Sequence, residues 1–215
     1  MSREDDYRAA RALSIEELKT CDIEQCCVRA KLETKNKSTG ERQVIFPYIN
    51  QRYILNIDGR TISFEEDAGR PSLPEQVLML HYLLKAKAIP FSGEMITFRE
   101  VPSGAFYYQA FFKRAIVPLA KGFGSHPSLL DRVADIIGEI VPFSADRALK
   151  IVILPRIPVI LSIWEEDEEF PAEGNIYFDT TISSHLSTED IVYAGSFAVY
   201  TALGIARDIE QRHKN

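Results

Sequence analysis

Apolar residues change their spacing along the chain, and each change marks a different kind of predicted element. From residue 26 to residue 66, short runs of β-branched and aromatic residues alternate with polar ones and are separated by turn-forming residues. This spacing is typical of strands. Asp58-Gly59 lies between two of the runs and indicates a tight hairpin. The pattern predicts an antiparallel meander of about four strands, the first of them over residues 26–33.

Helical spacing is found on both sides of this meander. Residues 3–19 predict one or two short amphipathic helices. After the meander, apolar residues recur every three or four positions and predict a helix from about Pro74 to the residues before Pro90. A second helix is expected over residues 104–123. It should be interrupted or kinked at Pro118, because proline has no backbone N–H to donate.

The C-terminal third combines strands with a long helix. Residues 148–154 and 158–164 form two nearly continuous apolar runs, as expected for strands buried on both faces. Residues 175–182 predict a third strand. The capping pattern Ser187-Thr188-Glu189-Asp190 then predicts the start of a last helix, which continues to about Gln211.

Together these elements predict the α+β class. We expect a single domain over residues 1–215, in which the antiparallel meander adjoins a mixed sheet packed by about four to five helices. The domain could divide into a meander lobe, residues 1–70, and a main lobe, residues 71–215.

Composition narrows the class of protein further. The 215 residues are 46% hydrophobic, which is enough for a substantial core. A net charge of −6 disfavours nucleic-acid binding through a broad basic face. The N-terminus is polar and lacks the apolar segment of a secretory signal, and no apolar run reaches the length of about 18 residues that a membrane span needs. We therefore expect a cytoplasmic protein that binds neither nucleic acid nor membranes.

Three cysteines, Cys21, Cys26 and Cys27, lie close together in the sequence. An odd number without a secretory signal indicates reduced thiols. A structural zinc or iron–sulfur site usually needs four protein ligands, and this spacing supplies three. Buried or half-buried free thiols are the simplest interpretation.

Five consecutive carboxylates follow the apolar run that ends at Trp164. Between Arg156 and Arg207 the chain has no lysine or arginine and nine acidic residues. This interval contributes −9 to the net charge of −6, so the remainder of the chain sums to +3. The acidity of the protein is therefore local, and its centre is residues 165–169.

Three interpretations of this acidic stretch stay open. A solvated loop is the simplest, because salt screens repulsion between exposed charges. A hard cation such as Mg²⁺ or Ca²⁺ prefers carboxylate oxygens, and Asp167, Glu169 and Asp179 are the candidate ligands because they lie at strand ends. The third interpretation is a docking surface for a basic partner. Burial of Trp164 and Phe170 would hold the loop in one shape and favour a site.

An aromatic cluster lies in the second predicted helix. Its members are Phe106, Tyr107, Tyr108, Phe111 and Phe112. Aromatic side chains four positions apart share a helix face and could form a wall for a flat ligand, such as a tetrapyrrole or a nucleotide base. Packing in the core is the alternative interpretation.

Polar residues near the predicted helices offer further candidates. Glu100 and Ser103 lie between a strand and a helix, where backbone N–H groups could hold an anion, although N-capping by Ser103 is the alternative. His81 lies on an apolar helix and is expected in the core with its ring hydrogen-bonded. His185 precedes the last helix and could pair with a carboxylate of the acidic segment, which would raise its pKa.

Several segments resemble those of an uncharacterised domain-of-unknown-function family, number 3786. They are FREVPSG (98–104), WEEDEEFP (164–171), IYFD (176–179), LSTED (186–190) and LHYLLKAKAIPFSGEMITF (80–98). The resemblance covers residues 70–200 well and the N-terminal third loosely. It implies a protein of anaerobic bacteria or archaea.

Some members of the family that this chain resembles carry an added iron–sulfur segment, like those of corrinoid-linked one-carbon enzymes. This chain has no such four-cysteine segment, so we expect no iron–sulfur cluster of its own. The resemblance brings no established activity with it and no catalytic roles.

Two functional hypotheses follow. The first is an accessory protein that binds a small ligand or a protein partner in anaerobic metabolism, with corrinoid-linked one-carbon chemistry as one setting. The second is an enzyme that uses a carboxylate cluster, with or without a divalent metal, for acid–base or hydrolytic chemistry. The candidate binding residues are Glu100, Tyr107, Tyr108, Phe111, Trp164, Asp167, Glu168, Glu169, Asp179 and His185. A divalent metal or a tetrapyrrole is the candidate cofactor.

Overall fold

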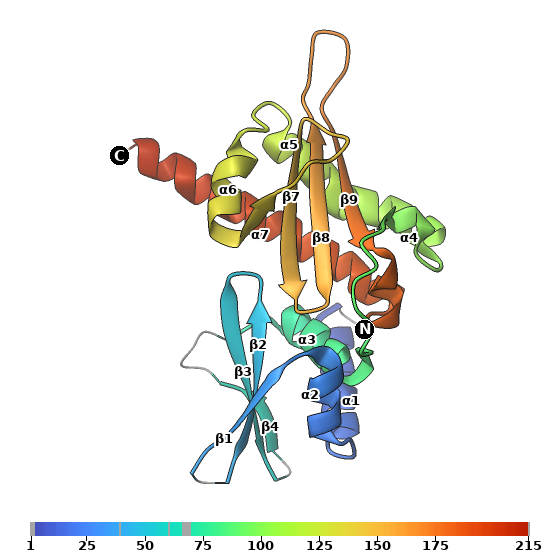
Figure 1. Ribbon diagram of the computed structural model, residues 1–215, viewed down its shortest axis with the longest axis vertical. Coiled ribbons are helices and arrows are strands. Elements are labelled where there is room, and N and C mark those ends of the chain that lie inside the picture. Colours follow the sequence, from blue (N-terminus) through green and yellow to red (C-terminus); the bar gives the residue numbers. More distant parts are fainter. Residues whose placement is uncertain (1–2, 39, 60, 66–69, 215) are drawn as a thin grey trace.

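The protein is an α+β structure made of two sheets and the helices that pack on them (Figure 1). The computed structural model describes residues 3–38, 40–59, 61–65 and 70–214. The predicted α+β class is confirmed. All described strand pairs are antiparallel, so the prediction of a mixed sheet is wrong. The long strands of the second sheet follow one another through hairpins, and hairpins join only antiparallel neighbours.

Three helices pack beside the first sheet: α1 (Arg3–Leu18), α2 (Ile23–Ala30) and α3 (Leu73–Lys85). Helix α2 occupies most of the segment in which residues 26–33 were predicted to form a strand. Its buried residues Ile23, Cys26, Cys27 and Ala30 recur at helical spacing, and the Asp22 carboxylate accepts a hydrogen bond from Gln25 N at 3.1 Å. The strand prediction was wrong because the alternation over residues 26–33 omits Ile23, which completes the helical stripe.

The first sheet is the predicted meander. Its strands are β1 (Glu33–Asn36), β2 (Arg42–Tyr48), β3 (Gln51–Asp58) and β4 (Thr61–Phe64), adjacent in that order. Asp58 pairs with Thr61 across the predicted hairpin, and Gly59 has the positive φ of +52° that such a turn needs. The meander begins later than predicted, and residue 66, its predicted end, lies outside the described residues.

The second sheet has the order β5-β9-β8-β7-β6. Its strands are β5 (Met95–Thr97), β6 (Gly138–Ile140), β7 (Arg147–Leu154), β8 (Ile157–Trp164) and β9 (Glu173–Asp179). Every residue of β8 before Trp164 is buried, as its continuous apolar run predicts.

Helices α4 (Gly104–Phe111), α5 (Val117–Phe123), α6 (Leu129–Ile137) and α7 (Thr188–Lys214) pack against this sheet and one another. A π-helical turn, Phe112–Ile116, separates α4 from α5. There Val117 N–H bonds to Phe112 O, five residues back, just before Pro118, which has no N–H to offer. The predicted interruption of this helix is therefore confirmed. No described helix is long and apolar enough to cross a membrane.

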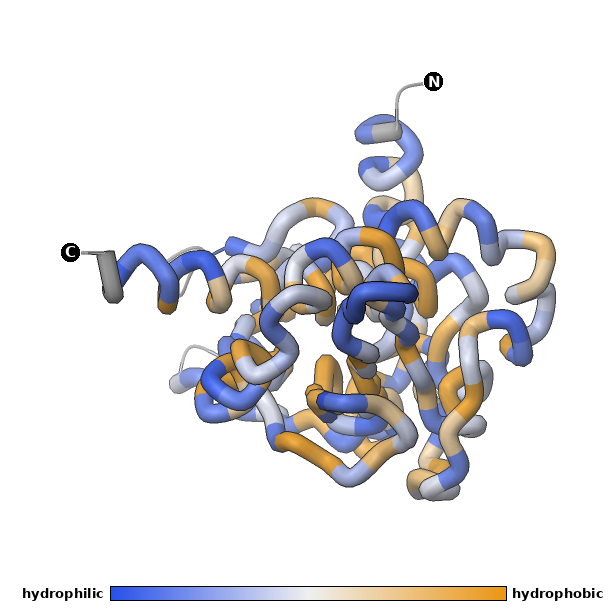
Figure 2. The backbone as a smooth tube through the Cα atoms, turned by 90° about the horizontal axis from the view of Figure 1, so that it is seen from above, coloured by the Kyte–Doolittle hydropathy of each residue, from blue (hydrophilic) through white to orange (hydrophobic). Residues whose placement is uncertain are grey.

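Helix α7 crosses the sheet, and its hydrophilic C-terminal end extends beyond the body of the molecule (Figure 2). Close packing occurs at Gly195, where a Cβ atom would lie 2.9 Å from a carbon of the Phe111 ring and 3.2 Å from one of Phe178. Gly204, nine residues further on, has open space around the same position. A residue without a side chain is therefore needed at Gly195, where α7 contacts Phe111 and Phe178, and is not needed at Gly204.

The molecule has two halves, the first sheet with α1 to α3 and the second sheet with α4 to α7, and they meet at the β7–β8 turn. The Arg156 guanidinium donates to the carbonyl oxygens of Arg29 at 2.7 Å and Ile89 at 3.0 Å. Ile49 N–H, in the β2–β3 turn, donates to Ile153 O of β7 at 3.1 Å. The Ile49–Ile153 bond joins backbone groups of the two halves, and Arg156 satisfies carbonyl groups of α2 and of the segment that follows α3.

The two helix glycines give a matched test of this packing. We expect Gly195→Ala to lower the melting temperature, because overpacking costs about 1–3 kcal/mol and exceeds the gain in helix propensity of at most about 1 kcal/mol. Gly204→Ala should raise it, because only the propensity gain applies. Urea and thermal unfolding measure both. Equal effects of the two substitutions would contradict the close approach of α7 at Gly195.

Candidate functional site

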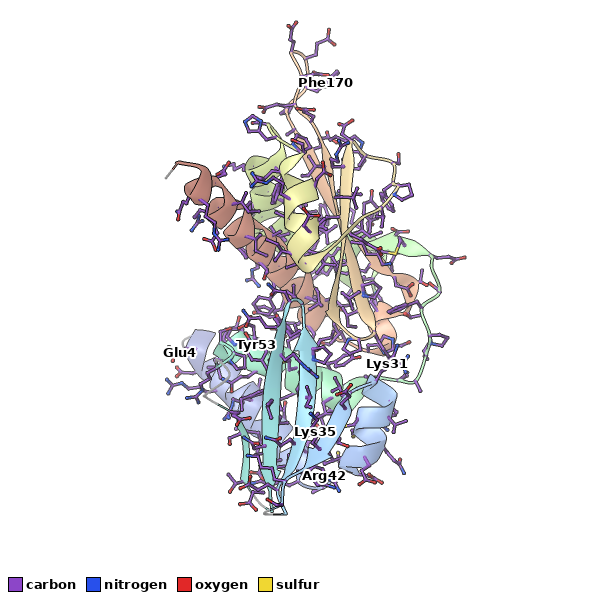
Figure 3. All side chains as sticks on the ribbon, turned by 60° about the vertical axis from the view of Figure 1, so that its left-hand side comes forward. Glu4, Lys31, Lys35, Arg42, Tyr53 and Phe170 are labelled. Carbon is purple, nitrogen blue, oxygen red and sulfur yellow. The ribbon has the colours of Figure 1, made fainter. Side chains whose placement is uncertain are left out.

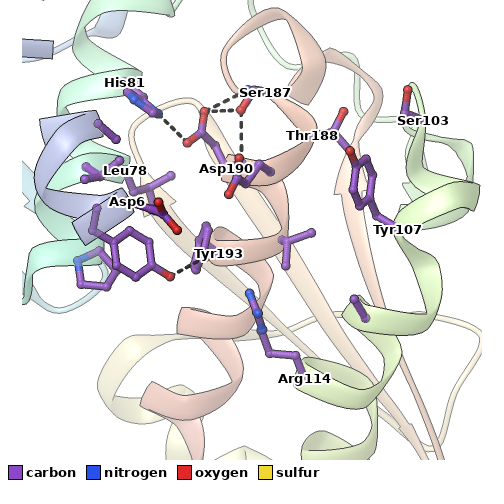
Figure 4. Close-up of a pocket in the computed structure, with 17 residues that line it drawn as sticks. Asp6, Leu78, His81, Ser103, Tyr107, Arg114, Ser187, Thr188, Asp190 and Tyr193 are labelled. Carbon is purple, nitrogen blue, oxygen red and sulfur yellow. Dashed lines mark hydrogen bonds and ion pairs between the residues drawn. The ribbon is translucent and has the colours of Figure 1, made fainter. Parts of the chain in front are cut away.

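A cavity of about 860 Å³ opens between α1, α3, α4 and the first turns of α7 (Figure 4). Its apolar wall consists of Ala10, Pro74, Val77, Leu78, Ala110 and Val192. The volume is within the range of small-molecule sites, which combine apolar walls with a few polar groups. The polar groups come from four helices that are distant in the sequence.

Asp190 is the most buried acidic group in the wall, with 3% of its surface exposed. As the last residue of the predicted capping pattern, it accepts hydrogen bonds from Ser187 N (3.2 Å) and Ser187 Oγ (2.5 Å). Its other oxygen lies 2.7 Å from His81 Nδ1. Burial opposes ionisation of Asp190, but the bonds from His81 and Ser187 and the nearby Lys85 outweigh it, and the pKa lies below its ordinary value.

This carboxylate orients the His81 ring. An ionised carboxylate only accepts hydrogen bonds, so Nδ1 of His81 carries a proton, and a neutral ring in this orientation keeps its lone pair on Nε2. The His81 side chain is 21% exposed and lines the cavity. A ring held in one tautomer by a carboxylate is the arrangement of a general base and its orienting group. Ser187 Oγ bonds to Asp190 and not to His81, so the three do not form a serine nucleophile site.

Arg114 lies across the cavity from the His81–Asp190 pair. It comes from the π-helical turn, and its guanidinium lies 5.3 Å from the centre of the Tyr193 ring. Tyr193 stands one turn after Asp190 on α7, and its hydroxyl is hydrogen-bonded to that of Tyr7 on α1. Figure 4 shows Arg114 and the His81–Asp190 pair on opposite sides of Tyr193.

The aromatic residues of α4 do not form a single wall. Phe111 is buried and stacks on Phe98 at a centroid distance of 4.3 Å. Tyr107 lines the cavity, Phe106 is 83% exposed, and the Tyr108 ring lies under the Arg99 guanidinium. Tyr108 and Phe112, four positions apart, do share a face at a centroid distance of 5.9 Å, as the spacing predicts. The five rings together do not form one wall, because consecutive helix positions turn by about 100°.

Other predicted residues near this helix have local roles. The Glu100 carboxylate accepts hydrogen bonds from Thr97 N (2.7 Å) and Thr97 Oγ1 (2.8 Å), which lower its pKa. It therefore caps a short 3₁₀ turn, Phe98–Glu100. Ser103 occupies the N-cap position of α4, as predicted, but it has a positive φ of 59° and its side chain makes no capping hydrogen bond.

The acidic residues divide between the two ends of β9. Asp167, Glu168 and Glu169 lie in the exposed β8–β9 hairpin, whereas Asp179 ends β9 and is buried. Six strand steps separate the two ends, which is about 20 Å. The predicted metal site of Asp167, Glu169 and Asp179 is therefore wrong. Among the residues that the structure describes, no group of three or more histidine, cysteine or acidic side chains is placed to hold a metal ion.

The hairpin keeps its shape in a different way from the one predicted. Phe170 is 66% exposed rather than buried, and Trp164 is half-buried. Asp167 Oδ1 accepts from Glu169 N (2.8 Å) and Phe170 N (2.7 Å), which closes the tip. The tip is therefore held by hydrogen bonds from its own backbone to the Asp167 side chain and not by an aromatic anchor.

Asp179 and His185 belong to a buried structural corner. Burial opposes ionisation of Asp179, but hydrogen bonds from Thr181 Oγ1 (2.6 Å), Thr181 N (3.0 Å), Gly93 N (2.9 Å) and Ser92 outweigh it and lower the pKa. His185 is fully buried and accepts from Lys87 N at 3.3 Å. Its pKa is lowered by burial and by Arg156, and Asp179 opposes this only in part. The prediction of a raised His185 pKa is therefore wrong.

The cysteines are free thiols, as predicted, and they lie in or next to α2. Cys26 and Cys27 are buried, and Cys26 Sγ accepts from Arg29 Nη2 at 3.2 Å. Burial, with the neighbouring Cys26, raises the pKa of Cys27 to about 12. A thiol that stays protonated is a poor nucleophile, so Cys27 acts as a small core residue.

Most of the cavity residues have no signature in the sequence. The sequence predicts His81 in the core with its ring hydrogen-bonded, and Asp190 in a helix cap. The ring is hydrogen-bonded and Asp190 does bond to Ser187, but neither prediction places its residue in a cavity wall. No sequence pattern marks Arg114, Tyr193 or Tyr7 as site residues, because their segments come together only when the helices pack. Of the predicted binding residues, Tyr107 alone lines this cavity.

The sequence model of one family, described as domain of unknown function (DUF3786), matches residues 22–201. The range includes α3, α4 and the start of α7, while α1 lies before it. No curated protein and no solved structure matches the chain. The family supplies no activity, so the chemistry has to be inferred from the cavity itself.

The buried His185 makes stability depend on pH. With its folded pKa below the ordinary value of about 6.5, the unfolded chain binds the proton first, and stability falls as the pH drops below that value. We expect His185→Gln to flatten this fall, because glutamine can still accept from Lys87 N but does not titrate. His126→Gln, at an exposed loop position, is the matched control and should leave the slope unchanged. Urea unfolding at several pH values between about 7.5 and 5 measures it, and an unaltered slope in the His185 variant would contradict the assignment.

Proposed function

The chain belongs to the DUF3786 family of domains of unknown function, and we propose that it binds a small organic anion in the cavity between α1, α3, α4 and α7. One observation carries this proposal. An apolar-walled cavity of about 860 Å³ holds a guanidinium, Arg114, on one side and a carboxylate-oriented imidazole, His81, on the other. Two such groups separated by apolar surface define both the position and the orientation of a ligand.

The charges of the wall suggest the kind of ligand. A planar guanidinium binds carboxylate and phosphate groups with two parallel hydrogen bonds, so the anionic group belongs at Arg114. Asp6, Glu189 and Asp190 also line the cavity, and Asp190 is bonded to His81, so the part of the wall around His81 favours a hydrogen-bond donor or a positive group. The proposed ligand therefore carries an acid group and a donor or cationic group, joined by an apolar body that fits between the tyrosine rings.

This proposal keeps the first functional hypothesis in a narrower form. The dispersed rings of α4 favour a small ligand over a flat tetrapyrrole. An accessory role in anaerobic, corrinoid-linked one-carbon metabolism and a location in the cytoplasm stay predictions.

Thermal-shift screening of amino acids, carboxylates and phosphate esters tests the proposal. A ligand at 100 times its Kd stabilises the native state by about 2.7 kcal/mol, which is about 5–10 °C in melting temperature. We expect Arg114→Gln to weaken binding on the order of 10- to 100-fold, because a charged hydrogen bond is lost. Arg99→Gln is the matched control, since Arg99 also lies over a tyrosine ring but outside the cavity.

A cavity-blocking pair completes this test. Ala110→Trp fills the wall of the cavity and should abolish binding, whereas Ala105→Trp, at an exposed position of the same helix, should not. If no compound of the panel binds, or if the two members of either pair behave alike, the proposed site is wrong.

The second candidate function is acid–base catalysis at His81, and the His81–Asp190 geometry is the observation that favours it. The pair replaces the carboxylate cluster of the second hypothesis, because the acidic residues of that cluster lie at opposite ends of β9. The free Nε2 would accept a proton from a ligand C–H or O–H group, and the Asp190 carboxylate would stabilise the imidazolium that forms.

Hydrogen–deuterium exchange into a bound compound, followed by NMR in D₂O at saturating ligand, tests the catalytic candidate. We expect His81→Gln to slow the exchange by about 10²–10⁴-fold while binding persists through Arg114. Ser187→Ala, which leaves the His81–Asp190 pair in place, should retain most of the exchange. Exchange that is equally fast in wild type and His81→Gln would eliminate His81 as the base.

A further inference from the structure

A second hollow, independent of the cavity, lies on another face of the same helical segment. It is a groove of about 730 Å³ between the α4–α5 segment and the start of β9. Tyr107, Ala110 and Arg114 face the cavity, whereas Tyr108, Phe112 and Ile116 line the groove. Trp164, Pro171 and Ala172 form part of the opposite wall.

The groove runs beside an incomplete sheet edge. Strand β5 pairs with β9 only at Tyr177, Phe178 and Asp179. Within the described part of the chain, no strand pairs with this side of residues 173–176, although β8 pairs with their other side. An open edge offers backbone N–H and C=O groups to an added strand. Ile176 N–H already donates to its neighbour Asn175 Oδ1 at 2.8 Å, so an added strand would exchange this local bond for a bond of its own.

Charge indicates what such a strand would carry. Glu166 and Glu173 line the groove, and Lys121 is the one basic residue among its described lining residues. The exposed carboxylates of residues 165–169 project beyond the groove in the β8–β9 hairpin, with Phe170 at its tip (Figure 3). The turn bonds of Asp167, and a 2.6 Å bond from Ser125 Oγ to Glu166, hold this hairpin in place next to the groove.

We propose that the groove binds an extended basic segment of a partner protein, which adds to the free edge of β9 in line with β5. Its backbone pairs with residues 173–176, its apolar side chains contact Phe112 and Ile116, and its lysine or arginine side chains face the acidic hairpin. This mode combines main-chain bonds for affinity with charge complementarity for selection of the partner.

The single tryptophan of the chain, Trp164, lies in the groove and reports on binding by its fluorescence. The probe is a capped peptide of alternating lysine and valine, long enough to span β9. Controls are a glutamate–valine peptide and the lysine–valine peptide with every second amide N-methylated. We expect the lysine–valine peptide to bind with an affinity that falls as salt rises, and both control peptides to fail.

Variants separate the groove from the hairpin. Phe112→Ala should weaken binding, whereas Phe106→Ala, which removes an exposed ring of the same helix outside the groove, should not. A triple variant, Glu165→Gln, Glu168→Gln and Glu169→Gln, leaves the Asp167 turn and the Glu166–Ser125 bond intact. It should weaken binding roughly tenfold and reduce the salt dependence.

Four results with the peptides and variants overturn the inference, and so does a fifth result without peptide. The four are absence of binding at millimolar peptide, equal binding of the glutamate–valine peptide, undiminished binding of the N-methylated peptide, and insensitivity to Phe112→Ala. A concentration-dependent change of Trp164 fluorescence without peptide would assign the groove to a second copy of the chain and also overturn it. Because none of these measurements involves the cavity, their failure leaves the proposed anion site untouched.

Discussion

A buried carboxylate has to be fully paired, and in this protein that requirement decides how the two halves meet. Asp190 begins α7, whose body packs on the second sheet, and its partners are Ser187 in its own cap and His81 on α3 of the first half. A carboxylate with so little access to water is stable only with such partners, because its desolvation costs several kcal/mol. The contact therefore places α3 beside the start of α7, and the cavity lies where α1 and α4 complete the enclosure.

Pro118 has an effect several residues before its own position. Because Pro118 has no N–H to donate, the helix forms a π-helical turn just before it. The residues of that turn are rotated relative to their positions in a continuous α-helix. Arg114 belongs to this turn and lies over Tyr193 in the cavity, while Phe112 and Ile116 face the groove. The segment from α4 to α5 therefore lines both the cavity and the groove. Of its aromatic residues, Tyr107 faces the cavity, Tyr108 and Phe112 face the groove, and Phe111 lies in the core.

The short length of β5 has a comparable effect on the second sheet. It covers only the end of β9 that holds Asp179, next to the buried corner around His185. The other end of β9 keeps a free edge beside apolar helix residues and the acidic hairpin. Acidic residues that are near one another in the sequence therefore have two unrelated environments: the carboxylates of the hairpin are solvated, and Asp179 is held by backbone N–H groups.

Local patterns determined the elements of this protein well. The meander, the interrupted helix, the continuous apolar strands and the cap at Ser187–Asp190 all follow from spacing and from the properties of single residues, and so does the α+β class. The error at α2 was also local, because one segment fitted two spacings. What the sequence could not supply was the partner of each polar group. His81 and Asp190 are 109 residues apart, and Tyr7 and Tyr193 are 186 apart. Such pairs form only when helices pack, since their distance depends on the burial of the whole apolar surface and not on any pattern near either residue.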